Sequence, residues 1–179
     1  EDQTLKPFSQ GHIVTAPPIP EWAPSVLVID PARTTDKQKS ARTGYCVFSW
    51  VGAKCYVRAA YGAFHKPDEI VNETFKLDAL YNPIWVRPEK DGLAEFLLQP
   101  YSASMVESGH VLPLMPLSAP RDRDKNSFIT GLQPFFEAAD VLMCGDFPDL
   151  VTELLAFPSG RKDVLNALAY APRCRPGAP

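Results

Sequence analysis

Three carboxylates stand at positions from which they could hold metal ions together. Asp30 ends the apolar run SVLVID, Glu89 ends the run IWVRPE, and Asp163 opens the last helical pattern of the chain. If the two runs are neighbouring strands and the helix packs against their ends, the three carboxylates converge. Converging carboxylates repel one another, and a hard divalent cation relieves that repulsion. Two such cations about 4 Å apart can hold a phosphodiester and activate a water, so these acids predict metal-dependent phosphodiester hydrolysis.

Each of these acids also has an ordinary structural explanation. Acids at strand ends are often solvated turn residues, and the helix dipole favours an acid in the first turn of a helix. Asp146 precedes Phe147 and Pro148, so it is most simply the N-cap of the next helix, with a fourth metal-ligand role as the alternative. The residue types alone leave both explanations open.

The elements that must position the acids alternate as in an α/β protein. Short apolar, β-branched runs predict strands, and apolar residues at a helical period predict helices. The expected strands are 25–30, 44–51, 54–64, 84–89 and 139–144, and the expected helices are 67–82, 92–107, 126–138, 147–157 and 162–171. Gly52 and Ala53 predict a hairpin, Pro100 and Pro134 predict kinks, and residues 110–117 predict an extended segment broken by proline. This order predicts a mixed central sheet with helices on its faces.

The composition suits one globular domain and excludes several classes of protein. The chain has 179 residues, of which 45% are hydrophobic and 22% charged. A net charge of −3 argues against binding of polyanions by bulk charge. No apolar run is long enough to span a bilayer, and the first ten residues do not form a signal peptide. The four cysteines form no CxxC pair and the three histidines are scattered, which argues against a zinc site.

Proline is concentrated toward the two ends of the chain. The segment APPIPEWAP predicts a stiff, extended linker, and the terminal PRCRPGAP predicts a disordered tail. We therefore expect a folded unit at 25–171, preceded by a linker at 1–24 and followed by a tail at 172–179.

Four stretches of the sequence resemble the nuclease domain of tailed-bacteriophage large terminase subunits. VIDPA at 28–32 resembles the family's first-strand motif, whose Asp binds metal, and WVRPEKDG at 85–92 resembles its fourth-strand motif. FPSGRKDVLNALA at 157–169 resembles the C-terminal motif, in which a Phe-Pro turn precedes an acid pair and a helix. KNSFITGLQPFFE at 125–137 resembles the helix before the penultimate strand. The four stretches occur in the family's order.

The resemblance implies a ribonuclease-H-like fold and an endonuclease that cuts concatemeric viral DNA during genome packaging. Asp30, Glu89 and Asp163 would be its catalytic residues and the ligands of two Mg²⁺ or Mn²⁺ ions. The implied partners are double-stranded DNA, the terminase ATPase domain, the small terminase subunit and the portal, in the host cytoplasm. No GxxxxGK[ST] motif occurs, so residues 1–24 would be a linker from a missing ATPase domain. We expect no membrane partner and a monomeric isolated domain.

The sequence departs from the family's pattern at two places. The last motif commonly has two adjacent acids and a third acid three residues later, where this chain has Lys162, Asp163 and Asn166. Asn166 shares a helix face with Asp163 and could hold a water or a phosphate. A second acid often follows the first-strand motif, and Asp36 is the nearby candidate. We therefore expect the second ion to bind weakly, or only when DNA is present.

Basic residues near the acids predict contacts with the DNA backbone, with ordinary solvated surface as the alternative. They lie in the loop after Asp30, in the loop before the helix at 126–138, and beside Asp163. They are Arg33, Lys37, Arg42, Arg121, Arg123, Lys125, Arg161 and Lys162. Backbone contacts of this kind predict little sequence preference.

Two other functions are compatible with the same residues. A junction resolvase or transposase-like nuclease would keep the fold and prefer branched DNA. A non-catalytic module that docks on DNA or on the portal would need no complete set of metal ligands, and the missing acid in the last motif favours it.

Overall fold

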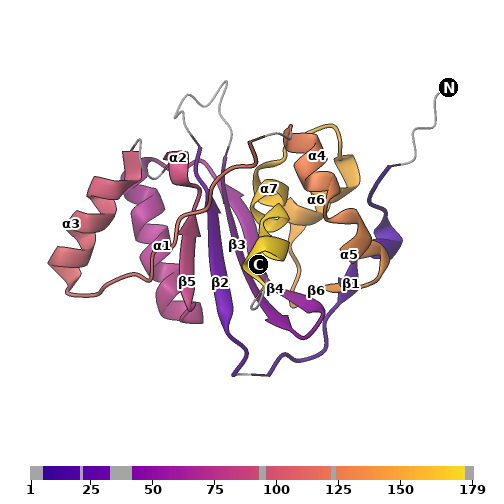
Figure 1. The fold of residues 1–179 in the computed structure, drawn as a ribbon, viewed down its shortest axis with the longest axis horizontal. Helices are drawn as coiled ribbons and strands as arrows, with labels where there is room; N and C mark the ends of the chain where they lie inside the picture. Colours follow the sequence, from indigo (N-terminus) through magenta and orange to yellow (C-terminus); the bar gives the residue numbers. More distant parts are fainter. Residues whose placement is uncertain (1–5, 21, 33–41, 93–95, 122–123, 176–179) are drawn as a thin grey trace.

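The chain forms a six-stranded mixed sheet with helices on both faces (Figure 1). The computed structural model describes residues 6–20, 22–32, 42–92, 96–121 and 124–175. The strands are β1 (Val14–Thr15), β2 (Ser25–Asp30), β3 (Thr43–Val51), β4 (Lys54–Ala63), β5 (Trp85–Pro88) and β6 (Val141–Met143). The helices are α1 (Pro67–Tyr81), α2 (Lys90–Gly92), α3 (Leu98–Ser108), α4 (Lys125–Thr130), α5 (Gln133–Glu137), α6 (Pro148–Ala156) and α7 (Asp163–Ala169), with 3₁₀ turns η1 (Gln10–His12) and η3 (Ala171–Cys174).

The strand order places the ends of β2 and β5 side by side. The sheet runs β1-β6-β4-β3-β2-β5, in which β2 pairs antiparallel with β3 and parallel with β5. Ile29 is opposite Pro88 in that parallel pair, and parallel strands present their carboxyl ends at the same edge of a sheet. The predicted mixed sheet flanked by helices is therefore confirmed, and the residues that follow β2 and β5 meet at one edge.

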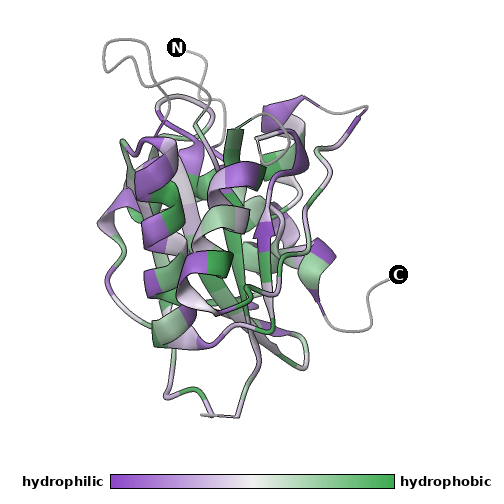
Figure 2. Cartoon of the chain, turned by 90° about the vertical axis from the view of Figure 1, so that its left-hand side faces the viewer, coloured by the Kyte–Doolittle hydropathy of each residue, from purple (hydrophilic) through white to green (hydrophobic). Residues whose placement is uncertain are grey.

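Alternation along the strands divides the core into two layers. In β2, Val26 and Val28 belong to the apolar cluster under α4, α6 and α7, while Leu27 and Ile29 belong to the cluster under α1 and α3. This is the two-residue period of a strand that is buried on both faces. Figure 1 shows the sheet between the two helical layers, and Figure 2 shows the α1 and α3 side, with hydrophobic strands behind helices of mixed hydropathy.

Two expected long helices are shorter in the structure. The helix expected at 126–138 is divided into α4 and α5, because Pro134 begins a new helix at its first turn. Gly131 joins the two, and its N–H donates to the carbonyl of Phe128 at 3.2 Å. Pro100 lies near the start of α3, which directly follows Phe96 and Leu97, two residues that are π-helical. The helix is therefore irregular next to Pro100, as a proline within a helical segment predicts.

The folded unit also extends beyond the boundaries expected from the proline pattern. Phe8 is 2% exposed and packs edge-on against Phe136, with ring centroids 5.2 Å apart. Strand β1 pairs parallel with β6. At the other end, the Trp50 indole N–H donates to the carbonyl of Ala171 at 2.9 Å, and Cys174 is buried. Apolar side chains within the proline-rich ends are thus part of the core. That residues 1–24 also form a linker to an ATPase domain stays a prediction.

Three of the four cysteines serve as small apolar groups in the core. All four are free, and Cys46, Cys55 and Cys174 are buried, while Cys144 is exposed. Burial raises the pKa of the Cys46 thiol, which keeps it protonated and unreactive at neutral pH. Among the described helices, none combines the length and the apolar character that a bilayer crossing requires.

Candidate active site

The three predicted acids lie at one edge of the sheet. Asp30 is the last residue of β2, and Glu89 follows β5, where its N–H donates to the carbonyl of Ile29 at 3.0 Å. Asp163 is the first residue of α7, which packs on β2 and β3. Gly44 lies opposite Asp30, and a Cβ atom on it would lie 2.1 Å from the backbone carbonyl oxygen of Asp163. A glycine at position 44 therefore lets α7 approach the end of β2 closely.

Gly44→Ala should destabilise the protein by about 1–3 kcal/mol. The added methyl group would overlap the backbone of Asp163 at the start of α7, and the whole helix would have to shift to make room for it. The free energy of unfolding in urea measures this effect. Gly11→Ala is the matched control, since a Cβ atom there meets only the Ser9 hydroxyl at 3.9 Å, and it should change stability by less than about 0.5 kcal/mol. Equal stability of the two variants would contradict the close approach.

Asp30 is the most perturbed acid at this edge. Its side chain is 15% exposed, its Oδ2 accepts a hydrogen bond from the Asn166 amide at 2.9 Å, and the Lys125 amine lies 4.0 Å from the same oxygen. The pKa of Asp30 is raised to about 7, chiefly by burial. The charges of Glu89 and Asp163 contribute to this rise, while Lys125 and the Asn166 amide oppose it. The carboxylates are thus close enough to repel one another.

Tyr170, which directly follows α7, supplies a second polar contact that sequence reasoning missed. The Tyr170 hydroxyl donates to Glu89 Oε2 at 3.0 Å, and its buried ring packs edge-on against Phe128. Asp163, Asn166 and Tyr170 follow an i, i+3, i+7 spacing, which places them on one helical face. That spacing was the available signal for Tyr170, and the contact orients the Glu89 carboxylate.

Asp163 lies against two arginines. Its Oδ2 is 3.8 Å from Arg42 Nε and 3.7 Å from an Arg161 guanidinium nitrogen. In the described part of the chain, this buried oxygen has no hydrogen-bond partner, and neither has Arg42 Nε. Arg42 also pairs with Glu153 at 2.9 Å and with Asp149 at 3.2 Å. The two arginines therefore offset a cluster of negative charge around Asp163.

Glu153 is the second residue that sequence reasoning missed. It lies in α6, and its Oε1 accepts hydrogen bonds from the backbone N–H groups of Val164 at 3.0 Å and Leu165 at 3.1 Å. These N–H groups belong to the first turn of α7, which has no intrahelical acceptors for them. Burial raises the pKa of Glu153, and these hydrogen bonds and Arg42 oppose the rise. A glutamate between Leu150 and Leu154 in an apolar helix was the available signal.

The oxygen donors at this edge suit a hard divalent cation in their chemistry, but they do not form a preassembled site. Among the described residues, no three Asp, Glu, His or Cys side chains are grouped closely enough to hold a metal ion. The amine of Lys125 lies near Asp30, and two guanidinium groups lie near Asp163. The raised pKa of Asp30 and the unpartnered oxygen of Asp163 fit an added cation. The shared metal site stays a prediction.

The basic residues expected to contact DNA have different surroundings. Arg33, Lys37 and Arg123 lie outside the described residues, as does Asp36. Lys125 and Arg161 are half-exposed beside the acids, Lys162 is half-buried before α7, and Arg121 is exposed. Arg42 differs, because its side chain is 15% exposed and is held in ion pairs within the domain, which leaves it little surface to offer DNA.

The N-cap role expected for Asp146 is wrong. Helix α6 begins one residue later than that role requires, with Phe147 at the N-cap and no side-chain hydrogen bond there. Asp146 is exposed in the turn between β6 and α6. Pro148 at the first turn of α6 fixes a helical backbone angle without needing an acceptor for an N–H, so this helix starts without a capping side chain.

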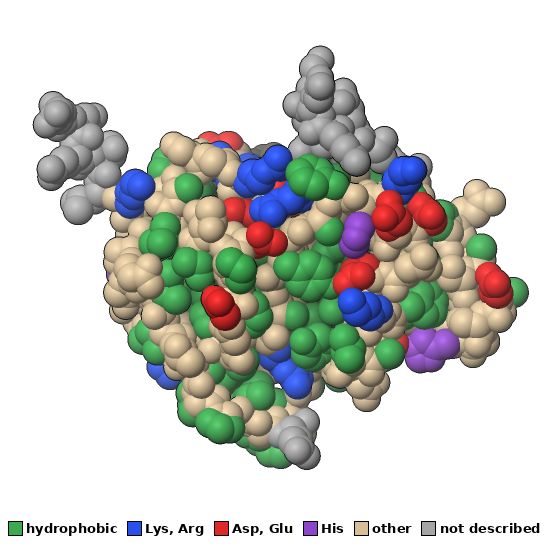
Figure 3. Space-filling model, turned by 180° about the vertical axis from the view of Figure 1, so that it is seen from behind, with side chains coloured by type: hydrophobic (Ala, Val, Ile, Leu, Met, Phe, Trp, Pro, Cys, Tyr) green, Lys and Arg blue, Asp and Glu red, His purple; other side chains and the backbone are tan. Residues whose placement is uncertain are grey.

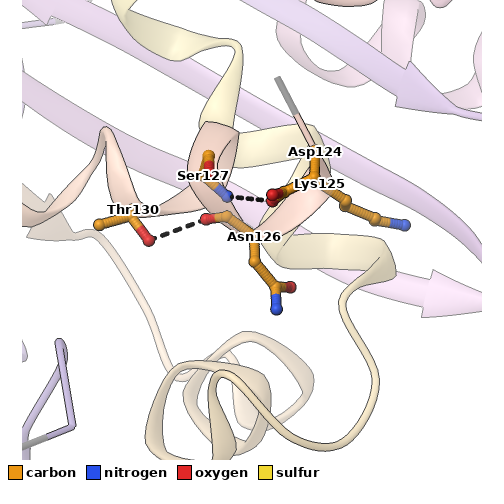
Figure 4. Close-up of a pocket in the computed structure, with 5 residues that line it drawn as sticks. All are labelled: Asp124, Lys125, Asn126, Ser127 and Thr130. Carbon is orange, nitrogen blue, oxygen red and sulfur yellow. Dashed lines mark hydrogen bonds between the residues drawn. The ribbon is translucent and has the colours of Figure 1, made fainter. Parts of the chain in front are cut away.

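A polar hollow lies at the beginning of α4, next to Asp30. Its volume is about 560 Å³, and it is lined by Asp124, Lys125, Asn126, Ser127 and Thr130. The Asp124 carboxylate accepts from the Ser127 N–H at 2.7 Å, and the Thr130 hydroxyl donates to the Asn126 carbonyl at 2.8 Å (Figure 4). The Lys125 and Asn126 side chains extend from the helix in different directions. Lys125 thus connects the hollow with Asp30.

Comparison with known proteins identifies the fold. No protein-family model and no curated protein matches the chain. Among solved structures, the nuclease domain of the phage P22 large terminase has a TM-score of 0.66 at 15% identity, with 93% of this chain and 89% of that chain covered. The large terminase nuclease of the thermophilic phage G20c, with bound cobalt, has a TM-score of 0.61 at 14% identity over 90% and 94% of the two chains.

A human cytomegalovirus protein has a similar architecture. The human cytomegalovirus terminase nuclease domain, soaked with Mn and bound to an inhibitor, has a TM-score of 0.60 at 13% identity, with 86% of this chain and 84% of that chain covered. All three matches thus extend over most of both chains. This chain therefore has the ribonuclease-H-like α/β fold of the terminase nuclease domains.

Proposed function

We propose that this chain is a divalent-metal-dependent DNA endonuclease that acts in viral genome packaging. The observation that supports the proposal is that Asp30 lies near enough to Glu89 and Asp163 for their charges to raise its pKa, in a fold shared with terminase nuclease domains. Two Mg²⁺ or Mn²⁺ ions, when bound to these carboxylates, would polarise the scissile phosphate and lower the pKa of a water. The Mn-soaked and cobalt-bound neighbours support a divalent ion as the cofactor.

The side chains around the acids would organise them for this work. The amide of Asn166 holds Asp30, and the hydroxyl of Tyr170 holds Glu89, which limits the number of orientations that either carboxylate can adopt. Because Asn166 replaces an acid that the family commonly has, the site carries less negative charge. We therefore expect one of the two ions to bind weakly until DNA phosphates add their charge.

Contacts with the DNA backbone would come from the basic residues around this edge. Lys125 and Arg161 lie beside the acids, and the polar hollow at α4 adds hydroxyl and amide groups. We propose that Lys162, which precedes Asp163, and the exposed Arg121 add further contacts. Such groups bind phosphates of any sequence, so we expect cleavage with little sequence preference. Asp146 would be at most an auxiliary ligand.

A longer structural neighbour suggests the larger protein in which this domain would work. The match to a large terminase from another thermophilic bacteriophage covers 92% of this chain but 42% of that chain. We propose that residues 1–24 connect this domain with a terminase ATPase domain, and that the small terminase subunit, the portal and concatemeric DNA in the host cytoplasm are its partners. The isolated domain should be a monomer.

Cleavage of supercoiled plasmid in the presence of Mn²⁺ tests the proposal. The unchanged protein should convert the plasmid to nicked and linear forms, and Asp30→Ala should abolish this conversion. Asp68→Ala, which removes an exposed acid of α1, is the control and should cut like the unchanged protein. Equal cutting by the Asp30 variant would show that this edge is not the active site.

A non-catalytic docking module is the second candidate function. Lys162 and Asn166 stand where the family commonly has acids. Among the described residues, no three potential metal ligands are grouped closely enough to hold an ion, and Asp30 lies beside the amine of Lys125. Retention of plasmid DNA without any cutting in Mn²⁺ or Mg²⁺ would favour this function. Preferential cutting of a four-way junction over plain duplex would instead indicate a resolvase-like nuclease.

A further inference from the structure

An aromatic side chain lies in solvent at the same edge of the sheet as the acids. Phe64 follows β4 directly and is 48% exposed. Asp30 is opposite Gly44 in β3, and Gly44 is opposite Gly62 in β4. Since neighbouring strands lie about 4.8 Å apart and rise about 3.4 Å per residue, the backbone at Phe64 is roughly 10–12 Å from that of Asp30.

Arg161 connects this ring with the candidate active site. Its guanidinium carbon lies 5.0 Å from the centroid of the Phe64 ring, and a guanidinium nitrogen lies 3.7 Å from Asp163 Oδ2. A guanidinium over an aromatic ring is held by a cation–π interaction, so its orientation is set before any ligand binds. The Arg161 side chain is still 48% exposed. Figure 3 shows basic side chains gathered at the upper end of the rear face, with acidic and hydrophobic side chains among them.

We propose that Phe64 and Arg161 form a binding site for one nucleotide of the DNA strand, in which the Phe64 ring stacks on an unpaired base and Arg161 binds an adjacent phosphate. This site rests on the proposed nuclease function, because its place on the strand is counted from the acids. A phenylalanine ring accepts any base by stacking, and arginine is well suited to bind phosphate.

The distance from the acids gives the position of this nucleotide. One strand of a DNA duplex rises about 3.4 Å per nucleotide along the helix axis, and an opened strand extends further per nucleotide, so roughly 10–12 Å places the site no more than about three nucleotides from the scissile phosphate. A base within a duplex has both faces covered by its neighbours. The site therefore favours DNA that is single-stranded or locally opened near the cut, and it defines the substrate class more narrowly than backbone contacts alone.

Binding of a short labelled single strand and of the matching duplex, measured by fluorescence anisotropy in EDTA, tests the site. Base stacking on an aromatic ring corresponds to about 5- to 100-fold in affinity, so Phe64→Ala should weaken single-strand binding by at least about 5-fold. It should change duplex binding by less than about 2-fold. Phe64→Trp should retain single-strand binding, and Arg161→Ala should lower the salt dependence by about one phosphate contact.

Val106→Ala is the matched control, because it removes an exposed apolar side chain of α3 in the opposite helical layer, and it should bind both DNAs normally. Unchanged single-strand affinity of Phe64→Ala, equal weakening for both DNAs, or no single-strand binding by the unchanged protein would each overturn the proposal. The plasmid assay distinguishes the two proposals. If no plasmid is cut but the Phe64 effect is present, the nuclease function fails and the nucleotide site stands.

Discussion

Metal-free protein that carries Asp30→Asn should be more stable than the unchanged protein at about pH 8, although this change removes the central carboxylate of the candidate site. The pKa of Asp30 is raised from 3.8 to about 7, chiefly by burial. At pH 8 the carboxylate is ionised in the folded and unfolded states, and its burial disfavours the folded one. A shift of about three pH units corresponds to about 4 kcal/mol, so we expect a gain of about 2–4 kcal/mol.

The pH dependence of this gain has a definite sign. A raised pKa in the folded state means that stability is fully present below the unfolded-state pKa and is lost as the pH rises through the folded-state pKa. The gain from Asp30→Asn should therefore be absent at about pH 4, grow between about pH 4 and 7, and be constant above. Thermal unfolding at several pH values measures it, with an expected rise in Tm of about 5–15 °C at pH 8.

A control and an added metal sharpen this test. Glu107→Gln, at the exposed end of α3, should change stability by less than about 0.5 kcal/mol at every pH. A ligand that binds only the folded protein raises its stability, so millimolar Mn²⁺ should raise the Tm of the unchanged protein and not that of the Asp30 variant. A stability gain from Asp30→Asn of equal size at pH 4 and pH 8 would contradict the perturbed carboxyl.

Glu153→Ala should destabilise the protein by about 3–5 kcal/mol. Breaking a buried ion pair by removing one partner is strongly destabilising. Here Arg42 loses its nearest carboxylate, Glu153 Oε2 at 2.9 Å, and keeps the longer contact with Asp149 at 3.2 Å and the one with Asp163 at 3.8 Å. The same change leaves the N–H groups of Val164 and Leu165 without the acceptor that they have now. Because those groups begin α7, the loss should also loosen the position of Asp163.

Urea unfolding of three variants separates the two contributions. Glu153→Gln keeps an oxygen acceptor for the α7 N–H groups and loses only the charge, so it should destabilise the protein less than Glu153→Ala. Glu107→Ala, an exposed glutamate, should change stability by less than about 0.5 kcal/mol. If Glu153→Ala were as stable as Glu107→Ala, the buried pair would contribute nothing to the fold.

Much of the secondary structure could be read from local patterns. The run at 25–30 became β2 with the same bounds, and the amphipathic segment at 67–82 became α1, which ends at Tyr81. These elements depend on residues close together in sequence, such as Pro67 at the helix start. The predicted helix at 126–138 was wrong in its continuity, since the pattern of apolar residues continues across Gly131 while the helix does not.

The residue types available for chemistry, the places of Asp30, Glu89 and Asp163 at the ends of their strands and helix, and the α/β order of the chain could all be read from the amino-acid sequence. What surrounds these acids became visible with the packed fold. Arg42 and Glu153 are 111 residues apart, and Tyr170 and Glu89 are 81 apart. Local periodicity carries no information on such pairs, because burial, ion pairing and pKa depend on atoms that approach through space after the sheet and α7 have packed.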